Sequence, residues 1–243
     1  MQAVHEAVSS FFDRSQSLLG AEEFNRLAAA KVAVVGVGGV GGWCAEALVR
    51  TGLGRILIID DDIVDPSNVN RQAPATALTL GRVKVEAMKE RLLSINPDCE
   101  VEARNERYTG GFPFDGCDVV VDAIDSVDCK AELILSVTSS CSSLISSMGA
   151  AFRTDPTKVT VSRFEKVEGD GLAKALRSRF KRLGRFPEKK FFCVWSTQPL
   201  CRAHHKDECK GSSMVVTATF GMCLAFQAVN LITGKCVDGK NKI

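Results

Sequence analysis

The sequence predicts an α/β protein with a doubly wound, mostly parallel sheet that carries helices on both faces. Two observations predict this fold class. Apolar, strand-like runs alternate with helical patterns through the first 150 residues, and a glycine-rich turn links the first run to the first helix. Parallel strands need a crossover, usually a helix, so this alternation is typical of a parallel sheet. The expected strands are KVAVVG (31–36), RILIID (55–60), CEVEAR (99–104), CDVVVDAID (117–125) and SLISSMG (143–149), with helices from about Val40, Arg82 and Val127.

The rest of the chain is expected to extend the same sheet. With 243 residues, 45% of them hydrophobic, the chain is long enough to bury one sizeable core. From Asp155 onward, a proline-marked turn precedes an alternating strand (158–164), a basic helix, the apolar run FFCVWST and a long apolar helix. We therefore expect one domain over 1–243. It has an N-terminal helical arm (1–30), a first α/β half (31–150) and an elaborated C-terminal half (151–243).

The sequence favours an intracellular protein without a membrane span. Its N-terminus lacks the basic stretch and apolar run of a secretory signal. Residues 214–234 approach the length of a membrane span, but Thr217, Thr219, Gln227 and Asn230 interrupt them, which favours a buried amphipathic helix. The ten cysteines are scattered singly and often lie in apolar segments, as reduced, buried side chains do. We expect the protein to be located in the cytoplasm, and association with an organelle stays open as an alternative.

The glycine-rich turn predicts a nucleotide site of the Rossmann type. Gly36, Gly38, Gly39 and Gly41 form GVGGVG directly after an apolar strand and before a helix. Such a turn brings backbone N–H groups close to a phosphate at a helix N-terminus. Asp60 ends the next strand, where a carboxylate can accept hydrogen bonds from ribose. Residues 31–150 are therefore expected to be the nucleotide-binding half. The alternative is a tight turn without a ligand, and the pattern alone fits NAD and ATP equally.

The residues after the second strand favour chemistry on a triphosphate. Asn68, Arg71 and Lys84 follow the ribose acid, and fixed cations stabilise the charge that develops during displacement at phosphate. Asp125 follows an apolar strand at the edge where α/β ligands bind, and its carboxylate can hold Mg²⁺. Taken singly, Lys84 fits a solvated helix face, Arg71 a surface ion pair, and Asp122 or Asp125 a helix cap. An NAD-dependent oxidoreductase or a nucleotide-sensing module also stays open.

A second charged feature is the basic run between Leu172 and Phe192. The net charge is only +2, yet this stretch holds eight Lys or Arg and one acid. Such a cluster can contact an anion, and the alternative is a solvated helix.

The ordered motifs GVGGVG, IIDDDIVDPSNVNRQ, GRVK and DAIDS resemble the MoeB/ThiF/ubiquitin-activating superfamily. Its members adenylate a carboxylate with ATP and Mg²⁺ on a ThiF-type fold. Within it, the chain is most similar to the tRNA threonylcarbamoyladenosine dehydratases. That similarity lies in FDRSQSLLG (12–20), INPDCEV, VDAIDSVDCKAELI, the segment from DPTKVTV to SRFKR, CVWSTQPL and SSMVVTATFGM.

The resemblance implies roles at the matching positions. The glycine turn and Asp60 would hold ATP, Asn68, Arg71 and Lys84 would surround its phosphates, and Asp125 would bind Mg²⁺. Arg14 would reach across a homodimer to the ATP of the other subunit. The catalytic set is therefore Arg14, Arg71, Lys84 and Asp125.

The resemblance also implies a reaction. The free carboxylate of threonylcarbamoyladenosine in tRNA would be adenylated, and the neighbouring urea would close onto the activated carbonyl with net loss of water. The basic run would then bind tRNA phosphates. The expected tRNA-binding residues are Lys174, Arg177, Arg179, Lys181, Arg182 and Arg185. A sulfur-transfer protein is a further candidate partner.

Two departures bear on the alternatives. The superfamily's activators of ubiquitin-like or sulfur-carrier proteins carry paired CxxC motifs for structural zinc, and this chain has none. We therefore expect no structural zinc and rank protein activation second. The nearest substitute set is Cys201, His204, His205 and Cys209, whose spacing fits no familiar zinc site. Cys193 and Cys209 are the candidates for a covalent thiol, although neither has a neighbouring motif that would activate it.

Overall fold

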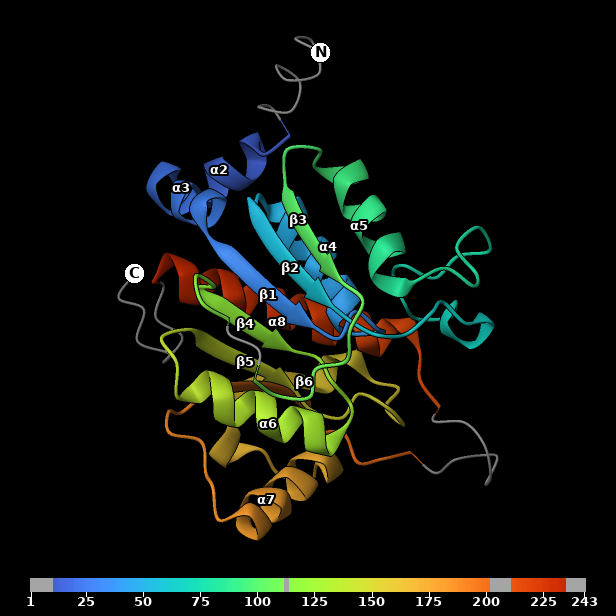
Figure 1. Cartoon of the computed structure of the whole chain (residues 1–243), viewed down its shortest axis with the longest axis vertical. Helices are drawn as coiled ribbons and strands as arrows, with labels where there is room; N and C mark the ends of the chain where they lie inside the picture. The colour runs from blue at the N-terminus through green and yellow to red at the C-terminus, as the bar shows by residue number, and fades with distance from the viewer. Residues whose placement is uncertain (1–10, 112–113, 202–210, 235–243) are drawn as a thin grey trace.

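The computed structural model describes residues 11–111, 114–201 and 211–234 (Figure 1). The strands are β1 Lys31–Val35, β2 Arg55–Ile59, β3 Glu100–Arg104, β4 Val119–Asp122, β5 Ser143–Ser147, β6 Val159–Arg163 and β7 Phe192–Ser196. The α-helices are α2 Asp13–Leu19, α3 Ala21–Ala29, α4 Gly41–Thr51, α5 Lys84–Ile95, α6 Val127–Thr138, α7 Gly171–Leu183 and α8 Met214–Thr233. Short 3₁₀ helices are η1 Pro66–Asn68, η2 Pro156–Lys158 and η3 Phe164–Lys166.

The strands form one sheet in the order β3-β2-β1-β4-β5-β7-β6. All neighbours are parallel except β6 and β7, which pair antiparallel. The predicted doubly wound, mostly parallel sheet is therefore confirmed. Both halves of the chain contribute strands to it, since β6 and β7 extend the edge next to β5. The order reverses between β1 and β4, and ligands of such sheets bind at this point, outside the carboxyl ends of the strands.

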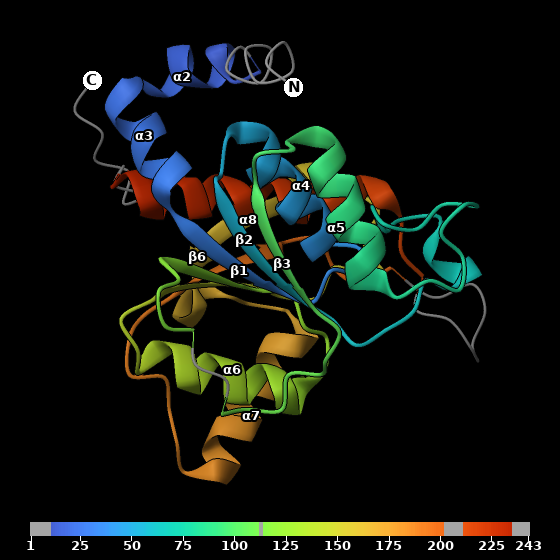
Figure 2. The same ribbon diagram turned by 45° about the horizontal axis from the view of Figure 1, so that its top comes forward.

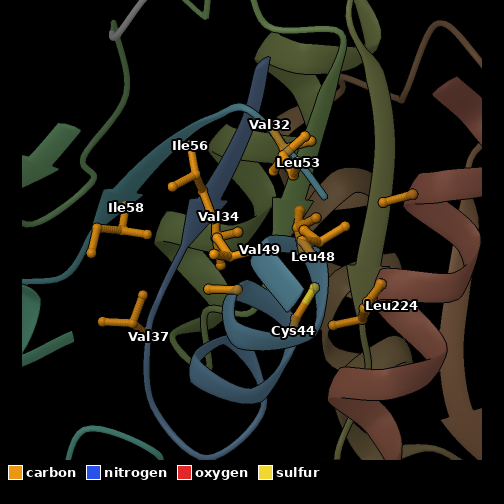
Figure 3. Close-up of a cluster of buried hydrophobic side chains, with 14 of the residues drawn as sticks. Val32, Val34, Val37, Cys44, Leu48, Val49, Leu53, Ile56, Ile58 and Leu224 are labelled. Atoms are coloured by element: carbon orange, nitrogen blue, oxygen red, sulfur yellow. The ribbon is translucent and has the colours of Figure 1, made fainter. Parts of the chain in front are cut away.

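Helices cover both faces of the sheet, and Figure 2 shows α4, α5 and α8 on one side and α6 and α7 on the other. The alternation of side chains along β1 explains this arrangement. Val32 and Val34 belong to the core under α4 and α8, where they lie with Cys44 and Leu224 (Figure 3). The residues that alternate with them on β1, Ala33 and Val35, belong to the opposite core under α6 and α7. A strand buried on both faces must be apolar at nearly every position, as KVAVV is.

Helix α8 is the one described helix long and apolar enough to cross a membrane, with a mean hydropathy of 1.7. Half of its apolar 18-residue stretch is buried inside the protein. The helix packs against α4 and strands β4 to β7. The sequence predicts a buried helix here, and the structure agrees for that half. Val215, Met222 and Phe226 lie on the exposed remainder.

The N-terminal helices lie far from the carboxyl edge of the sheet. Helix α3 ends at Ala29 and the chain enters β1 at Lys31, so α2 and α3 stand beside the amino ends of the strands (Figure 1). The predicted helical arm is therefore separated from the glycine turn by the length of β1.

Candidate functional site

A cavity of about 650 Å³ opens at the carboxyl edge of the sheet. Its walls come from the segments after β1 to β5 and after β7, together with the first turns of α5, α7 and α8. The site is thus assembled from strand ends that are far apart in sequence but adjacent in the sheet. Of the predicted residues, the structure brings Gly36, Gly38, Gly39, Asp60, Arg71, Lys84 and Asp125 to this cavity.

The four glycines of the turn divide into two roles. Gly36 has a φ of +88°, and a Cβ there would lie 2.8 Å from the Ala123 carbonyl oxygen. A Cβ on Gly41 would lie 1.8 Å from the Gly36 carbonyl oxygen, so Gly41 permits close packing of the turn, and it does not line the cavity. Gly38 and Gly39 have more room and face the cavity. Because the N-terminus of α4 has no side-chain cap, its first amides remain suited to a bound anion.

Asp60 is fixed by the turn that it faces. Its Oδ2 accepts a hydrogen bond from the Val37 amide at 2.8 Å, and its Oδ1 accepts one from the Asp62 amide at 3.0 Å. The Lys84 ammonium lies 3.3 Å from Asp60 Oδ1 and 2.7 Å from Asp62 Oδ2. Lys84 is only 3% exposed, so the sequence-based alternative of a solvated lysine is wrong. A buried cation therefore stands beside the predicted ribose acid.

Among the described residues, the one group of side chains placed closely enough to hold a metal ion includes the same acids. Oxygen atoms of Asp60, Asp61 and Asp62 lie within 4.8 Å of one another. Because Lys84 already binds two of these carboxylates, they are poorly suited to a divalent cation.

Arg71 reaches the cavity from the segment after η1. Its Nη1 donates to the Ser67 carbonyl oxygen at 2.7 Å and to Asn70 Oδ1 at 2.9 Å. Trp43 of α4 donates from Nε1 to the Arg71 carbonyl oxygen at 2.8 Å, which ties this segment to the helix after the glycine turn. A Cβ on Gly39 would lie 3.3 Å from Arg71 Cγ, so the arginine side chain passes directly over the turn.

Asn68 does not line this cavity. Its side chain closes the capping box of η1, where Asn68 Oδ1 accepts from the Asp65 amide at 3.2 Å. The structure therefore shows Asn68 shaping the segment that carries Arg71, rather than facing the cavity with it.

Asp125 lies on the cavity wall just after β4, above a buried ion pair. Lys130 Nζ is 2.9 Å from Asp122 Oδ2 and also donates to the Ile124 carbonyl oxygen at 2.9 Å. Ser146 donates to the same Asp122 oxygen at 2.6 Å. Burial raises the pKa of Asp122, and the contact with Lys130 opposes that shift. Lys130 thus joins α6 to the backbone immediately before Asp125.

Three of the six predicted tRNA-binding residues already have partners in the protein. Arg177 donates to the Phe164 and Val167 carbonyl oxygens at 2.8 and 2.7 Å, and its guanidinium lies 4.9 Å from the Phe164 ring centroid. Arg179 pairs with Asp128 at 3.0 Å. Arg185, although exposed, pairs with Glu132 at 3.4 Å.

The other three basic residues, Lys174, Lys181 and Arg182, are exposed on α7. Asp170 caps the N-terminus of this helix, since its Oδ1 accepts from the Ala173 amide at 2.9 Å, and Asp170 also lines the cavity. The basic helix therefore starts at the cavity and runs away from it.

Arg14 is exposed on α2 and does not line the cavity. Cys193 is fully buried on β7, and burial raises its pKa well above the ordinary value, which is unfavourable for a nucleophilic thiolate. Cys201 is partly buried beside Thr154. His204, His205 and Cys209 lie outside the described residues.

Several cavity residues have no counterpart among the sequence predictions. Arg107 and Tyr108, after β3, line it, as does the segment from Met148 to Phe152 after β5. The sequence could have indicated these residues, because each segment directly follows a predicted strand. The carboxyl ends of all parallel strands meet at the same edge of the sheet, where ligands bind.

The comparisons with known proteins show the family and the fold. Residues 12–243 match the ThiF family. The chain is 43% identical to a tRNA threonylcarbamoyladenosine dehydratase of Bacillus subtilis over 71% of this chain and 70% of that protein. It is 34% identical to the Escherichia coli enzyme of the same name over 96% and 97%. The E. coli enzyme in complex with ATP superposes with a TM-score of 0.85 at 36% identity, covering 92% and 94% of the two chains. The resemblance identified from the motifs is thereby confirmed.

Proposed function

The chain belongs to the ThiF family, and we propose that it is an ATP-dependent tRNA threonylcarbamoyladenosine dehydratase. One observation carries the proposal: a cavity that joins a glycine turn and a ribose-type acid to Arg71, Lys84 and Asp125. A hydride-transfer site has no need of a fixed arginine beside a carboxylate that can hold Mg²⁺, whereas attack on a triphosphate does. Relatives with this name match nearly the full length of the chain, and the E. coli relative has been crystallised with ATP and with AMP.

The reaction has two steps at this cavity. A carboxylate oxygen of the threonylcarbamoyl group attacks the α-phosphorus of ATP, and the bond to the β-phosphate breaks to release pyrophosphate. A nitrogen or oxygen of the urea then attacks the activated carbonyl carbon, and AMP leaves as that C–O bond breaks. The substrate loses one water overall. Since the second attack is intramolecular, the protein chiefly positions the groups and stabilises charge.

The residues have distinct tasks in this scheme. Asp60 accepts hydrogen bonds from the ribose, and the turn with the N-terminus of α4 holds the phosphates. The aliphatic part of the Arg71 side chain lies over the turn, and its guanidinium would offset the negative charge of the displaced pyrophosphate. Lys84 neutralises the acids beside the ribose site.

Asp125 is the residue that would hold Mg²⁺. It lies on the cavity wall at the end of β4, and carboxylate oxygen is a preferred ligand of this ion. When bound there, Mg²⁺ would supply charge neutralisation for the phosphates. The ion pair beneath, between Asp122 and Lys130, keeps the backbone before Asp125 in place.

The exposed basic residues of α7 would contact the tRNA backbone. Lys174, Lys181 and Arg182 are exposed on a helix whose first residues line the cavity. A phosphate backbone bound along α7 would therefore lead toward the reacting group. Because tRNA is an intracellular substrate, we place the protein inside the cell, with the cytoplasm as the first candidate compartment.

A homodimer would complete the site. Arg14 is on α2, which stands beside the amino ends of the strands, and within one chain it does not line the cavity at their carboxyl ends. The partner subunit's Arg14 is therefore the arginine proposed to reach the ATP. The exposed apolar face of α8, formed by Val215, Met222 and Phe226, offers an interface.

The decisive test is the reaction itself. Purified protein, ATP and tRNA carrying threonylcarbamoyladenosine should yield a nucleoside lighter by one water in mass spectrometry, with AMP formed in equal amount. Unmodified tRNA is the control and should form no AMP. If the substrate nucleoside is still intact after prolonged incubation with the protein and ATP, the proposal is overturned.

A further inference from the structure

Phe152 occupies an unusual position in the cavity. It is the one non-glycine residue of the described chain with a positive φ, +58°. L-residues with side chains rarely adopt this backbone conformation, which costs free energy relative to glycine. The protein nevertheless carries a large aromatic residue here, and Phe152 lines the cavity.

The backbone around Phe152 is held on both sides. Its amide donates to the Gly211 carbonyl oxygen at 2.8 Å, and its carbonyl oxygen accepts from the Cys201 amide at 2.9 Å. A Cβ on Gly211 would lie 3.7 Å from Phe152 Cδ1, so the ring also rests against that backbone. These contacts fix the conformation that presents the ring.

The cavity around this ring differs from the nucleotide end. The residues before it, Gly149, Ala150 and Ala151, are small, and Leu172 and Leu200 add further apolar wall. The glycine turn, Asp60 and Lys84 at the other end are suited to ribose and phosphate. The Phe152 end therefore combines this apolar surface and one aromatic ring with the carboxylate of Asp170, which accepts a hydrogen bond from the Gly149 amide at 3.1 Å.

The order of strands places Phe152 on the side of the ATP phosphates where the second substrate, whose carboxylate is adenylated, would bind. Asp60 follows β2, the glycine turn follows β1, Asp125 follows β4 and Phe152 follows β5, and these strands are consecutive neighbours in the sheet. Neighbouring strands lie about 4.8 Å apart. With the ribose at β2 and the phosphates at β1, the second substrate has room on the β5 side.

We propose that Phe152 is the platform on which the modified adenine base of the tRNA stacks while its carboxylate approaches the α-phosphate. This inference rests on the proposed function and names the base-recognition residue of the same site. Bases that are displaced from a single-stranded RNA loop are commonly bound by stacking on aromatic side chains. The partial burial of Phe152 leaves part of the ring open to such a base.

Two substitutions separate stacking from structural support. Phe152→Gly removes the ring and suits the positive φ, so the variant should unfold at the same temperature as the wild type or higher. Phe152→Tyr keeps the ring and is the matched control. The KM for modified tRNA and the Kd for ATP are measured for each variant in the dehydration assay and by calorimetry, respectively.

The expected result is a KM for modified tRNA at least about fivefold higher in Phe152→Gly, because stacking of one base contributes about 1 kcal/mol or more. The Kd for ATP should stay within twofold, and Phe152→Tyr should match the wild type in both. A KM within twofold of the wild type in a folded Phe152→Gly variant would overturn the inference. So would an equal loss of ATP affinity, because the ring would then serve the nucleotide end. An inactive wild type would refute the proposed function instead.

Discussion

Lys130 Nζ and Asp122 Oδ2 lie 2.9 Å apart in an ion pair with no exposed surface, and Lys130 also binds the carbonyl oxygen of Ile124. This pair connects α6, β4 and the segment that carries Asp125. A structural contact thereby fixes the position of a proposed catalytic carboxylate, and its removal should affect both stability and turnover.

Lys130→Met should destabilise the protein by about 3–5 kcal/mol, because it leaves the Asp122 carboxylate buried without its cation. The double variant Asp122→Asn with Lys130→Met should lose less, since no buried charge remains. Urea denaturation of the two variants measures the difference. Equal stability of the single and double variants would show that the pair does not act as a coupled unit.

The pH dependence of stability should reveal Glu46. This carboxylate is almost fully buried, which by itself raises its pKa, but hydrogen bonds from Arg91 and Arg50 outweigh burial and hold the pKa below its ordinary value. Because the folded-state pKa is depressed, Glu46 stabilises the fold above about pH 4.3 and loses this effect as pH falls through the folded-state value. The difference in unfolding free energy between wild type and Glu46→Gln should therefore be largest at neutral pH. A difference that grows on acidification would contradict the assignment.

Two glycines of the turn should respond differently to alanine. A Cβ on Gly41 would lie 1.8 Å from the Gly36 carbonyl oxygen, so Gly41→Ala should lower the melting temperature and abolish ATP binding. The nearest atom to a Cβ on Gly38 is a Gln72 side-chain nitrogen at 3.8 Å, so Gly38→Ala should fold normally. We expect Gly38→Ala to weaken ATP binding alone, because its new methyl group faces the cavity. Thermal-shift assays with and without ATP distinguish these effects, and a destabilised Gly38→Ala would be the contrary result.

On the basic helix α7, an exposed arginine should affect tRNA binding, whereas an arginine bonded to the backbone should affect stability. Arg182→Glu should weaken tRNA binding and lower the magnitude of the salt slope by about 1, as expected for a lost phosphate contact. Arg177→Ala should instead cost about 2 kcal/mol of stability, because its guanidinium bonds to two backbone carbonyl oxygens are lost. Filter binding over a series of salt concentrations and urea denaturation measure the two quantities. An unchanged salt slope in Arg182→Glu would remove α7 from the tRNA-binding surface.

The architecture followed from the sequence because buried parallel strands have a distinct pattern. KVAVV, RILII and VVVD are apolar at nearly every position, and the glycine turn fixes where β1 ends and α4 begins. The acids at the strand ends, Asp60 and Asp125, were also predictable, because parallel strands place their carboxyl ends at one edge.

Other features depend on distances that a sequence pattern does not encode. The burial of Lys84 arises from two carboxylates 22 and 24 residues earlier in the chain. Likewise, nothing in LRSRFKR separates Arg177, which points at η3 and the residue after it, from Arg182, which is exposed. Asn68 matched a motif, yet its local cap became visible only with the backbone conformation of η1.

The proposed role of Arg71 and Asp125 is to adapt a dinucleotide-type fold to breaking the bond between the α- and β-phosphates of ATP. Exchange of labelled pyrophosphate into ATP tests it most directly, because exchange requires reversible formation of the acyl-adenylate. We predict that tRNA carrying threonylcarbamoyladenosine stimulates exchange, and that Arg71→Ala and Asp125→Asn each reduce it by about 100-fold or more while the protein stays folded. Full exchange in both variants would contradict the claim, as would stimulation by the C-terminal tail of a small protein instead of by modified tRNA.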